Sequence, residues 1–275
     1  DPSDGGRTMR STGRLNYHYD TTSGGRFFAN AYAQYYRFDL FTNFTFFQND
    51  PVNGDGFQQT ELRIKCGGNC GYNQNRRWFD MDGAAAVGVQ SRVDHIHARL
   101  GPQVLRNPLG STSDTDITEA SYAPFFKLEV QPAPWMRLAG GVRSEVFTFD
   151  VRNRCQTCVA QASGTADSGL VLPKANLILG PWWRTELFLN YGEGYHSNDA
   201  RSAVTPAASP LARAKSYEVG LRSRPWGSDG IELTATVWAL DMKQELVFVG
   251  DEGTTEIRGA SRRRGMEVGA RGQVW

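Results

Sequence analysis

GPWWRTELFLNYGEGYHSNDAR, residues 180–201, is the stretch of this 275-residue chain that decides the fold. After the Gly-Pro pair, large apolar or β-branched residues occupy every second position: Trp183, Thr185, Leu187, Leu189 and Tyr191. The positions between them are mostly polar: Arg184, Glu186, Phe188 and Asn190. Alternation with a period of two predicts a β-strand that has one face in an apolar environment and the other in a polar one.

The same alternation recurs along the chain, in segments separated by clusters of Gly, Pro, Asn, Asp and Ser, and no long segment has a helical period. We expect eleven strands, at residues 11–21, 26–48, 57–71, 83–99, 117–131, 135–151, 169–180, 182–193, 213–225, 230–249 and 262–275. The run over residues 26–47 would be one strand of about 20 residues, well beyond the usual length in a globular protein.

The connections between these segments alternate between short and long. Tight turns are expected at residues 23–25, 131–134, 180–181 and 225–229, and long polar loops at residues 100–117, 152–169, 193–213 and 250–261. Alternating strands alone would fit a soluble β-sandwich nearly as well as a barrel. Short turns at one end and long loops at the other favour an outer-membrane β-barrel.

Four tryptophans lie beside the predicted short turns: Trp135, Trp182, Trp183 and Trp226. Aromatic residues at one end of the strands suit the interface girdle of a membrane barrel, and ordinary core aromatics beside turns are the alternative. No stretch reaches the roughly 18 apolar residues that a transmembrane helix needs. A barrel escapes that requirement because only every second residue of its strands has to be apolar.

The strand count and both ends of the chain predict an incomplete barrel. Bacterial single-chain barrels have an even number of strands, and open edges are not tolerated in lipid. The last segment ends in Trp275, but polar residues or glycine share its face: Gln273, Arg271, Gly269 and Glu267. The first ten residues are polar and their only methionine is Met9, so we expect a cut there.

Charge and motifs exclude other classes of protein. Thirty Lys and Arg residues against 29 Asp and Glu residues give a net charge of +1, without the basic excess of a nucleic-acid binder. We find no nucleophile–base signature, no phosphate loop and no carboxylate pair suited to catalysis. The sequence therefore predicts neither an enzyme nor a cofactor.

The cysteines and two histidines are candidates for covalent or metal chemistry. Cys66 with Cys70 and Cys155 with Cys158 form two close pairs, which we interpret as small loop disulfides. One zinc site built from all four cysteines is the alternative. His95 and His97 share a strand face, where they are either metal ligands or polar residues at the membrane interface.

Six segments in order resemble the barrel of TonB-dependent receptors. The sharpest is ELFLNYGEGYHSNDAR (residues 186–201), which resembles a strand and loop late in that barrel. The others are FDLFTNFTFFQNDPVNGDGFQQTELR (38–63), LAGGVRSEVFTFDV (138–151), LPKANLILGPW (172–182), KSYEVGLRSRPW (215–226) and ELVFVGDEGTTEIRGASRRRGMEV (245–268). Each motif alone is weak, and their order over about residues 26–268 carries the resemblance.

The resemblance implies an all-β fold, an antiparallel transmembrane β-barrel with a plug domain inside it. We expect residues 1–275 to be a partial TonB-dependent receptor β-barrel domain, about half of a 22-stranded barrel, with the plug domain absent. The implied function is active transport across the bacterial outer membrane of a scarce ligand, such as a ferric siderophore or cobalamin. TonB would supply energy through an N-terminal segment not present here, and membrane lipid and lipopolysaccharide would surround the barrel. A passive porin or adhesin and a secreted carbohydrate-binding β domain are the alternatives.

Two groups of polar residues are candidate contact sites. The loop residues His196, Asn198, Asp199 and Arg201 are expected to touch the ligand from the extracellular side, or else to hold the strand end in place. Arg262, Arg263 and Arg264 would bind an acidic ligand or lipopolysaccharide phosphate, or else lie at a solvated strand end or along the lumen.

Overall fold

A computed structural model describes residues 3–78, 80–155, 158, 162–198, 200–204, 210–227, 230–249 and 254–272. Its strands are β1 (Gly5–Asp20), β2 (Gly25–Thr42), β3 (Phe57–Trp78), β4 (Met81–Val104), β5 (Asn107–Pro108), β6 (Ser113–Ala133), β7 (Met136–Asn153), β8 (Gly164–Trp182), β9 (Thr185–Ser197), β10 (Leu211–Ser223), β11 (Glu232–Met242), β12 (Glu245–Val249), β13 (Thr254–Arg258) and β14 (Ser261–Arg271). One short helix, α1 (Ala200–Ala203), lies between β9 and β10.

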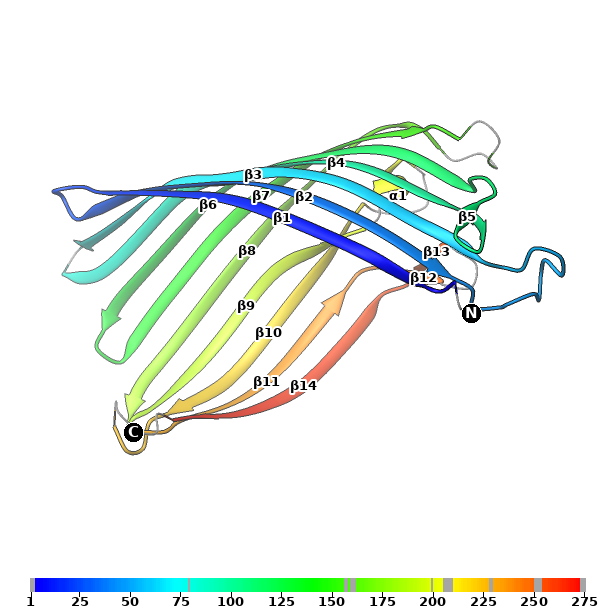
Figure 1. Cartoon of the computed structure of the whole chain (residues 1–275). Coiled ribbons are helices and arrows are strands. Elements are labelled where there is room, and N and C mark those ends of the chain that lie inside the picture. Colours follow the sequence, from blue (N-terminus) through cyan, green and yellow to red (C-terminus); the bar gives the residue numbers. More distant parts are fainter. Residues whose placement is uncertain are drawn as a thin grey trace.

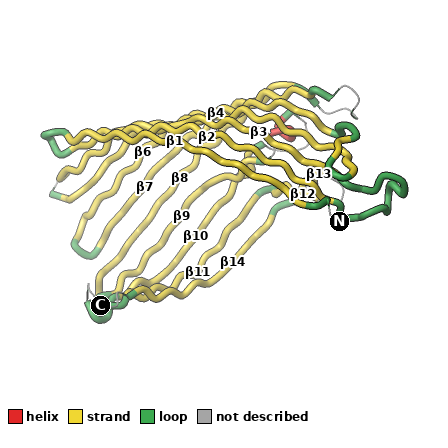
Figure 2. The backbone as a smooth tube through the Cα atoms, viewed as in Figure 1, coloured by secondary structure: helices red, strands yellow, loops and turns green. Residues whose placement is uncertain are grey.

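The long strands form one antiparallel sheet in chain order, β1-β2-β3-β4-β6-β7-β8-β9-β10-β11-β14, with β5 paired to β4. Strands β12 and β13 pair only with each other. The sheet curves into an open half-barrel, with β1 along one free edge and β14 along the other (Figures 1 and 2). The all-β antiparallel barrel portion expected from the sequence is confirmed. None of the helices among the described residues is long and apolar enough to span a membrane.

The turn before β9 is not where the sequence places it. Trp183 and Arg184 are its central residues, with φ angles of 49° and 63°. Two successive positive φ angles define a type I′ turn, whose twist matches that of the flanking strands. Gly180 and Pro181 instead lie inside β8, where the pairing with β9 shifts register between Leu179 and Trp182.

Two expected strands are shorter than predicted. β2 ends at Thr42, and Phe46, inside the expected strand, has a φ of 57°, which a strand cannot accommodate. The Asp55 carboxylate accepts backbone hydrogen bonds from Asn49 and Asp50, at 2.7–3.1 Å, and folds the following residues into a loop. The segment 230–249 divides in the same way, since β11 ends at Met242 and β12 leaves the main sheet.

The two faces of the sheet differ as the alternation predicts. The outer, convex face carries exposed apolar side chains: Leu15, Tyr17, Val87, Tyr122, Val171, Val219, Val237 and Met266. The inner face carries most of the charged and amide groups. On β4, for example, Val87 is 55% exposed whereas Asp94, on the opposite face, is fully buried.

Inward aromatic rings cover glycines of the neighbouring strand at several positions. A Cβ added to Gly220 would lie 2.2 Å from the Phe188 ring. The same relation joins Gly71 with Phe28, and Gly88 with Phe125. A glycine without a side chain lets a cross-strand ring lie flat against the sheet, which contributes to the pairing.

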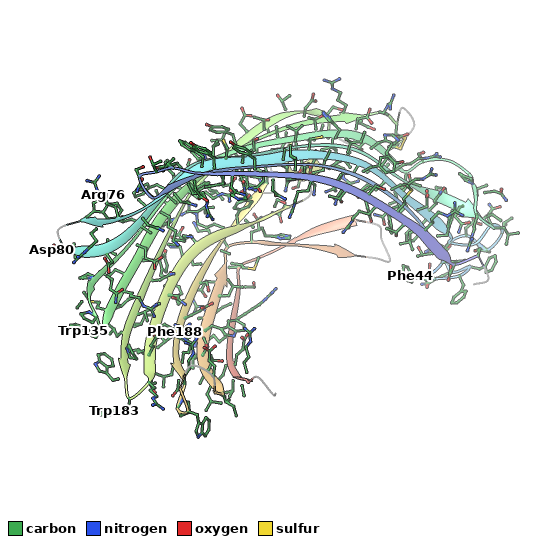
Figure 3. The ribbon with its side chains drawn as sticks, turned by 60° about the vertical axis from the view of Figure 1, so that its left-hand side comes forward. Phe44, Arg76, Asp80, Trp135, Trp183 and Phe188 are labelled. Atoms are coloured by element: carbon green, nitrogen blue, oxygen red, sulfur yellow. A yellow bond between two sulfur atoms is a disulfide. The ribbon has the colours of Figure 1, made fainter. Side chains whose placement is uncertain are left out.

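The ends of the half-barrel are asymmetric. Short turns join β1 to β2, β3 to β4, β6 to β7, β8 to β9 and β10 to β11, all at one end. The four turn tryptophans lie at this end, where Figure 3 labels Trp135 and Trp183. Trp183 and Trp226 are 96% and 67% exposed, so they are surface aromatics rather than core residues.

Candidate functional site

The β9–β10 hairpin leaves the wall of the half-barrel at its long-loop end. Pairing between β8 and β9 stops at Lys174 and Gly192, whereas β9 stays paired with β10 as far as Ser197 and Leu211. α1 follows β9 and contacts β6, β7 and β8. We call the described residues of this part of the chain, 193–198, 200–204 and 210–214, the inner flap.

The inner flap is attached to the wall by a hydrophobic cluster. The Tyr195 ring meets Phe147 of β7 edge-on, with ring centroids 5.6 Å apart. Other members of the cluster are Ile96, Ile117, Phe149, Val151, Ala200 and Leu211, each with 6% or less of its surface exposed. Burying side chains of this size contributes roughly 1.5–3 kcal/mol each. This packing holds the flap against the inner face of β4, β6 and β7.

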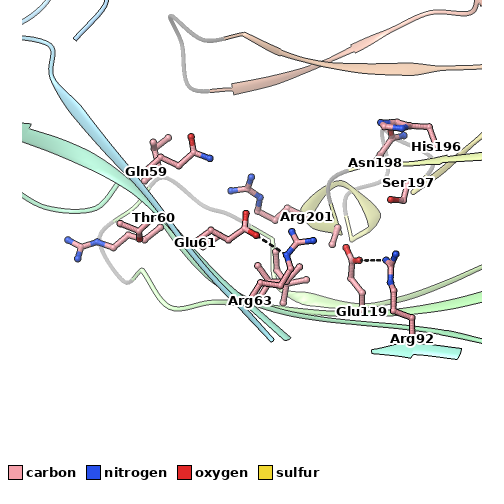
Figure 4. Close-up of a pocket in the computed structure, with 16 residues that line it drawn as sticks. Gln59, Thr60, Glu61, Arg63, Arg92, Glu119, His196, Ser197, Asn198 and Arg201 are labelled. Atoms are coloured by element: carbon pink, nitrogen blue, oxygen red, sulfur yellow. Dashed lines mark hydrogen bonds and ion pairs between the residues drawn. The ribbon is translucent and has the colours of Figure 1, made fainter. Parts of the chain in front are cut away.

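A polar pocket of about 460 Å³ lies between the inner flap and the wall (Figure 4). The flap contributes His196, Ser197, Asn198 and Arg201. The wall residues whose charged side chains line it, on β3, β4 and β6, are Glu61, Arg63, Arg92 and Glu119. Convergent polar groups in a concave site are typical of a small-molecule site.

Ion pairs organise the wall of the pocket. Arg63 Nε lies 2.8 Å from Glu61 Oε1, and Arg92 Nη2 lies 3.3 Å from Glu119 Oε2. Behind them, the fully buried carboxylate of Asp94 lies 3.8 Å from Arg63 Nη1 and 3.5 Å from Arg92 Nε. Lys65 Nζ is 3.9 Å from the same carboxylate. A buried carboxylate among three cations holds those side chains at fixed positions, because charge pairs are screened less when they are buried.

Positive charge is in excess in the pocket. Three arginines with side chains on the inner side line it, Arg63, Arg92 and Arg201, with two glutamates, Glu61 and Glu119. The Arg99 side chain is on the other face of β4, with His95 and His97, where it donates to Ser111 Oγ at 2.7 Å and to the Gly110 carbonyl at 3.1 Å. Arg201 Nη1 lies 3.4 Å from Ser113 Oγ. The pocket therefore favours anionic groups.

Three of the four loop residues selected from the sequence line this one pocket. His196, Asn198 and Arg201 are brought together by the turn into α1, and the Asn198 backbone N–H donates to the Pro210 carbonyl at 2.9 Å. Asp199 lies outside the described residues. The charged wall residues were not among the candidates predicted from the sequence. Their signal was present as charges at alternate positions of the strands, opposite the apolar face.

A family model described as "TonB dependent receptor-like, beta-barrel" matches residues 1–275. The chain belongs to this family. TonB-dependent receptors are transporters of the outer membrane rather than enzymes, and an outer-membrane position accounts for the apolar outer face of the sheet.

Solved structures of TonB-dependent receptors share the fold. The ferric citrate transporter FecA is 15% identical, with a TM-score of 0.79, and the match covers 98% of this chain and 40% of FecA. The siderophore receptor PiuA from Acinetobacter baumannii is 14% identical, with a TM-score of 0.78, covering 99% of this chain and 45% of PiuA. The copper transporter OprC is 16% identical, with a TM-score of 0.74, covering 99% of this chain and 45% of OprC. The chain thus spans less than half of each. Comparison with curated protein sequences gave no match.

The cysteine pairs of this TonB-dependent receptor barrel differ from each other. Cys155 and Cys158 are joined in a disulfide in the loop after β7. The expected disulfide between Cys66 and Cys70 is wrong, because both are free and exposed on β3. Four residues of extended strand span roughly 13 Å, more than the 4.4–6.8 Å between Cα atoms that a disulfide spans.

The histidine pair of the receptor barrel lies on its outer face. His97 Nδ1 is 2.7 Å from Asp116 Oδ1, and His95 Nδ1 is 3.1 Å from Thr118 Oγ1. Within the part of the chain that the structure describes, no group of three or more His, Cys, Asp or Glu side chains could hold a metal ion.

Proposed function

We propose that the protein is an outer-membrane receptor that imports a scarce small molecule, such as a ferric siderophore, with energy delivered through TonB. The observation that carries the proposal is the pocket between the inner flap and the charged wall. There His196, Asn198 and Arg201 face arginines from strands far away in the sequence. The alternative role of these residues, holding the strand end in place, agrees with the packing of the flap on the wall, and the binding assays below distinguish the two roles.

The cargo class is anionic in this proposal, since the side chains of three arginines line the pocket against two glutamates. Arginine binds carboxylate oxygens through two parallel N–H groups. The printed names of the structural neighbours include ferric citrate, a siderophore and copper as cargo. Among these, an iron complex with carboxylate groups suits the charge of the pocket best.

Transport assays on the full-length receptor test the proposal. Cells that carry the receptor are starved of iron and supplied with ferric citrate, a ferric catecholate complex, cyanocobalamin or Cu²⁺, with and without TonB. We expect TonB-dependent uptake of at least one iron complex. Uptake that continues without TonB would instead identify a passive porin, and no uptake of any probe would favour an adhesin.

Binding assays with variants test the site itself. Replacing Arg201 with Gln should weaken binding of the transported complex by about tenfold, because a charge-assisted hydrogen bond is lost. Arg152→Gln is the matched control, since Arg152 lies on the outer face and pairs with Asp150 at 2.7 Å. An affinity of Arg201→Gln equal to that of the Arg152→Gln control would move the ligand to another part of the receptor.

A further inference from the structure

Two aromatic side chains of β2 stand beside the polar pocket. Tyr36 and Phe38 lie on the inner face of the strand, whereas Tyr35 lies on the outer face. The register places Tyr36 opposite Arg63 and Phe38 opposite Glu61, and both of these β3 residues line the pocket (Figure 4). Since the Cβ atoms of directly opposite residues are about 4.5–5.5 Å apart, the two rings extend the lining of the pocket towards β1.

The two rings lie parallel and have a cation on either side. Their planes differ by 9° and their centroids are 6.4 Å apart. From β1, the guanidinium of Arg10 lies over the Tyr36 ring, with Cζ 5.3 Å from the centroid. From β3, Arg63 lies opposite the same ring. We call Tyr36 and Phe38 the aromatic shelf.

Other inward rings of β2 have a structural role that the aromatic shelf lacks. Phe28 and Tyr32 lie opposite Gly71 and Gly67, where an added Cβ would lie 2.7 Å from the Phe28 ring or from the Tyr32 hydroxyl. The shelf instead lies opposite charged residues. Among the described residues, the buried cluster that holds the inner flap contains neither of its rings. Covering a glycine or holding the flap therefore does not account for the shelf.

The aromatic shelf and the pocket together suit a ring that carries negative charge. Aromatic rings attract one another in offset-stacked or edge-to-face arrangements, beyond the area that they bury. Guanidinium groups beside such a site bind anionic oxygens through planar sets of donors. The charge of the pocket alone would accept any anionic iron complex, ferric citrate included, whereas the rings add affinity only for an aromatic one.

We propose that the cargo is an anionic iron complex whose iron-binding oxygens are carried on aromatic rings, as in a catecholate. One ring of the complex lies against Tyr36 and Phe38, and the negative charge of the complex faces Arg10 and Arg63. This inference rests on the proposed function of the pocket and narrows its cargo to one chemical class.

Binding to the full-length receptor in detergent tests the cargo class. The two probes are a ferric tris-catecholate and ferric citrate, which are both anionic but differ in aromatic character. We expect the ferric tris-catecholate to bind at least about tenfold more tightly. Equal or tighter binding of ferric citrate would overturn the inference and leave the proposed function standing, whereas binding of neither complex would contradict both.

Variants assign the preference to the aromatic shelf. Tyr36→Leu/Phe38→Leu keeps apolar side chains but removes both ring faces, and it should lower the ratio of the two affinities by about tenfold. Tyr36→Phe keeps the ring and should keep the ratio. Tyr35→Leu is the matched control, since it removes a ring from the same strand on the outer face, where Tyr35 is 37% exposed.

Folding of each variant is checked by heat-modifiable gel migration. If the double variant does not fold, Tyr36→Leu alone decides, with an expected decrease of the ratio by about threefold. A wild-type ratio in the folded variant would refute the role of the aromatic shelf.

Discussion

The buried carboxylate of Asp94 is the residue on which the charged wall depends. Replacing it with Asn leaves Arg63, Lys65 and Arg92 without their shared counter-charge. We expect Asp94→Asn to lower the free energy of unfolding by about 3 kcal/mol, since removing one partner of a buried ion pair leaves the others uncompensated. The loss of unfolding free energy is measured by urea unfolding of the full-length receptor in detergent, with the folded fraction determined from heat-modifiable gel migration.

A control for this change is available on the surface of the same strand. Asp82 pairs with Arg77 at 3.4 Å, but its side chain is 77% exposed. We expect Asp82→Asn to change stability by less than about 1 kcal/mol, because exposed ion pairs are weak and screened. Equal losses from both substitutions would show that the three cations do not need Asp94.

Gly220 is required by the ring that covers it. A methyl group at this position would collide with Phe188, so we expect Gly220→Ala to destabilise the barrel by about 1–3 kcal/mol. Gly13 has nothing within 4 Å of an added Cβ, and Gly13→Ala should be neutral or stabilise the strand by about 0.5–1 kcal/mol. Comparison of the two unfolding free energies tests whether the contact of the Phe188 ring with Gly220 stabilises the barrel.

At the residue scale, part of the site could be predicted from the sequence. His196, Asn198 and Arg201 stand out as a polar cluster after an apolar strand. The charged positions of β3 and β4 could be assigned to the inner face by alternation alone. Which charged residues contact each other could not be predicted from the sequence. The approach of Arg63 to Asp94 depends on the register between two strands, and a register shift of one residue would move every side chain of a strand to the other face.

The inner flap is an element whose position depends on one aromatic contact. Tyr195→Ala removes the ring that meets Phe147, and a truncation of this size should cost roughly 2–3 kcal/mol of local packing. We expect faster protease cleavage between β9 and β10, together with weaker binding of the transported iron complex.

Tyr217→Ala is the matched control for the flap. Tyr217 belongs to the same hairpin, and its ring lies 5.2 Å from that of Tyr191 on the outer face. Its removal should leave the cleavage rate between β9 and β10 unchanged. If the protease cleaves Tyr195→Ala no faster than this control, the flap is held by contacts other than the one between Tyr195 and Phe147.

The strands themselves were predictable as elements, whereas their ends were not. Period-two patterning located all eleven members of the main sheet, because each has one lipid-facing side. The ends depend on turn geometry, such as the positive φ angles at Trp183 and Arg184. The inner flap could not be predicted either, because the alternation of apolar and polar residues does not indicate that β9 separates from β8 after Gly192.

At the scale of the whole molecule, the apolar outer face is expected to contact lipid, and the reactivity of two thiols on that face tests this orientation. Cys66 and Cys70 share the outer face of β3 with Leu62 and Ile64, which are 39% and 48% exposed. In a membrane we expect both thiols to react with an uncharged, lipid-soluble maleimide and not with a charged, water-soluble one, because charged reagents do not enter the hydrocarbon region. In the unfolded receptor both reagents should react.

The labelling experiment has its own control. Val52 lies in the loop between β2 and β3 and is 84% exposed, so Val52→Cys should react with the charged reagent in intact membranes. Labelling of Cys66 and Cys70 by that reagent, at the rate of the Val52→Cys control, would place β3 in water and contradict the membrane orientation.

The main sheet follows chain order, so each strand along it bonds only to the strands before and after it. Duplication or loss of one complete hairpin would therefore alter the circumference of the barrel while every retained pair keeps its register. A fold of this kind can drift in size by hairpin steps over evolutionary time, with its loops diversifying independently at the opposite rim. Low sequence identity alongside a shared architecture is the expected record of such a history.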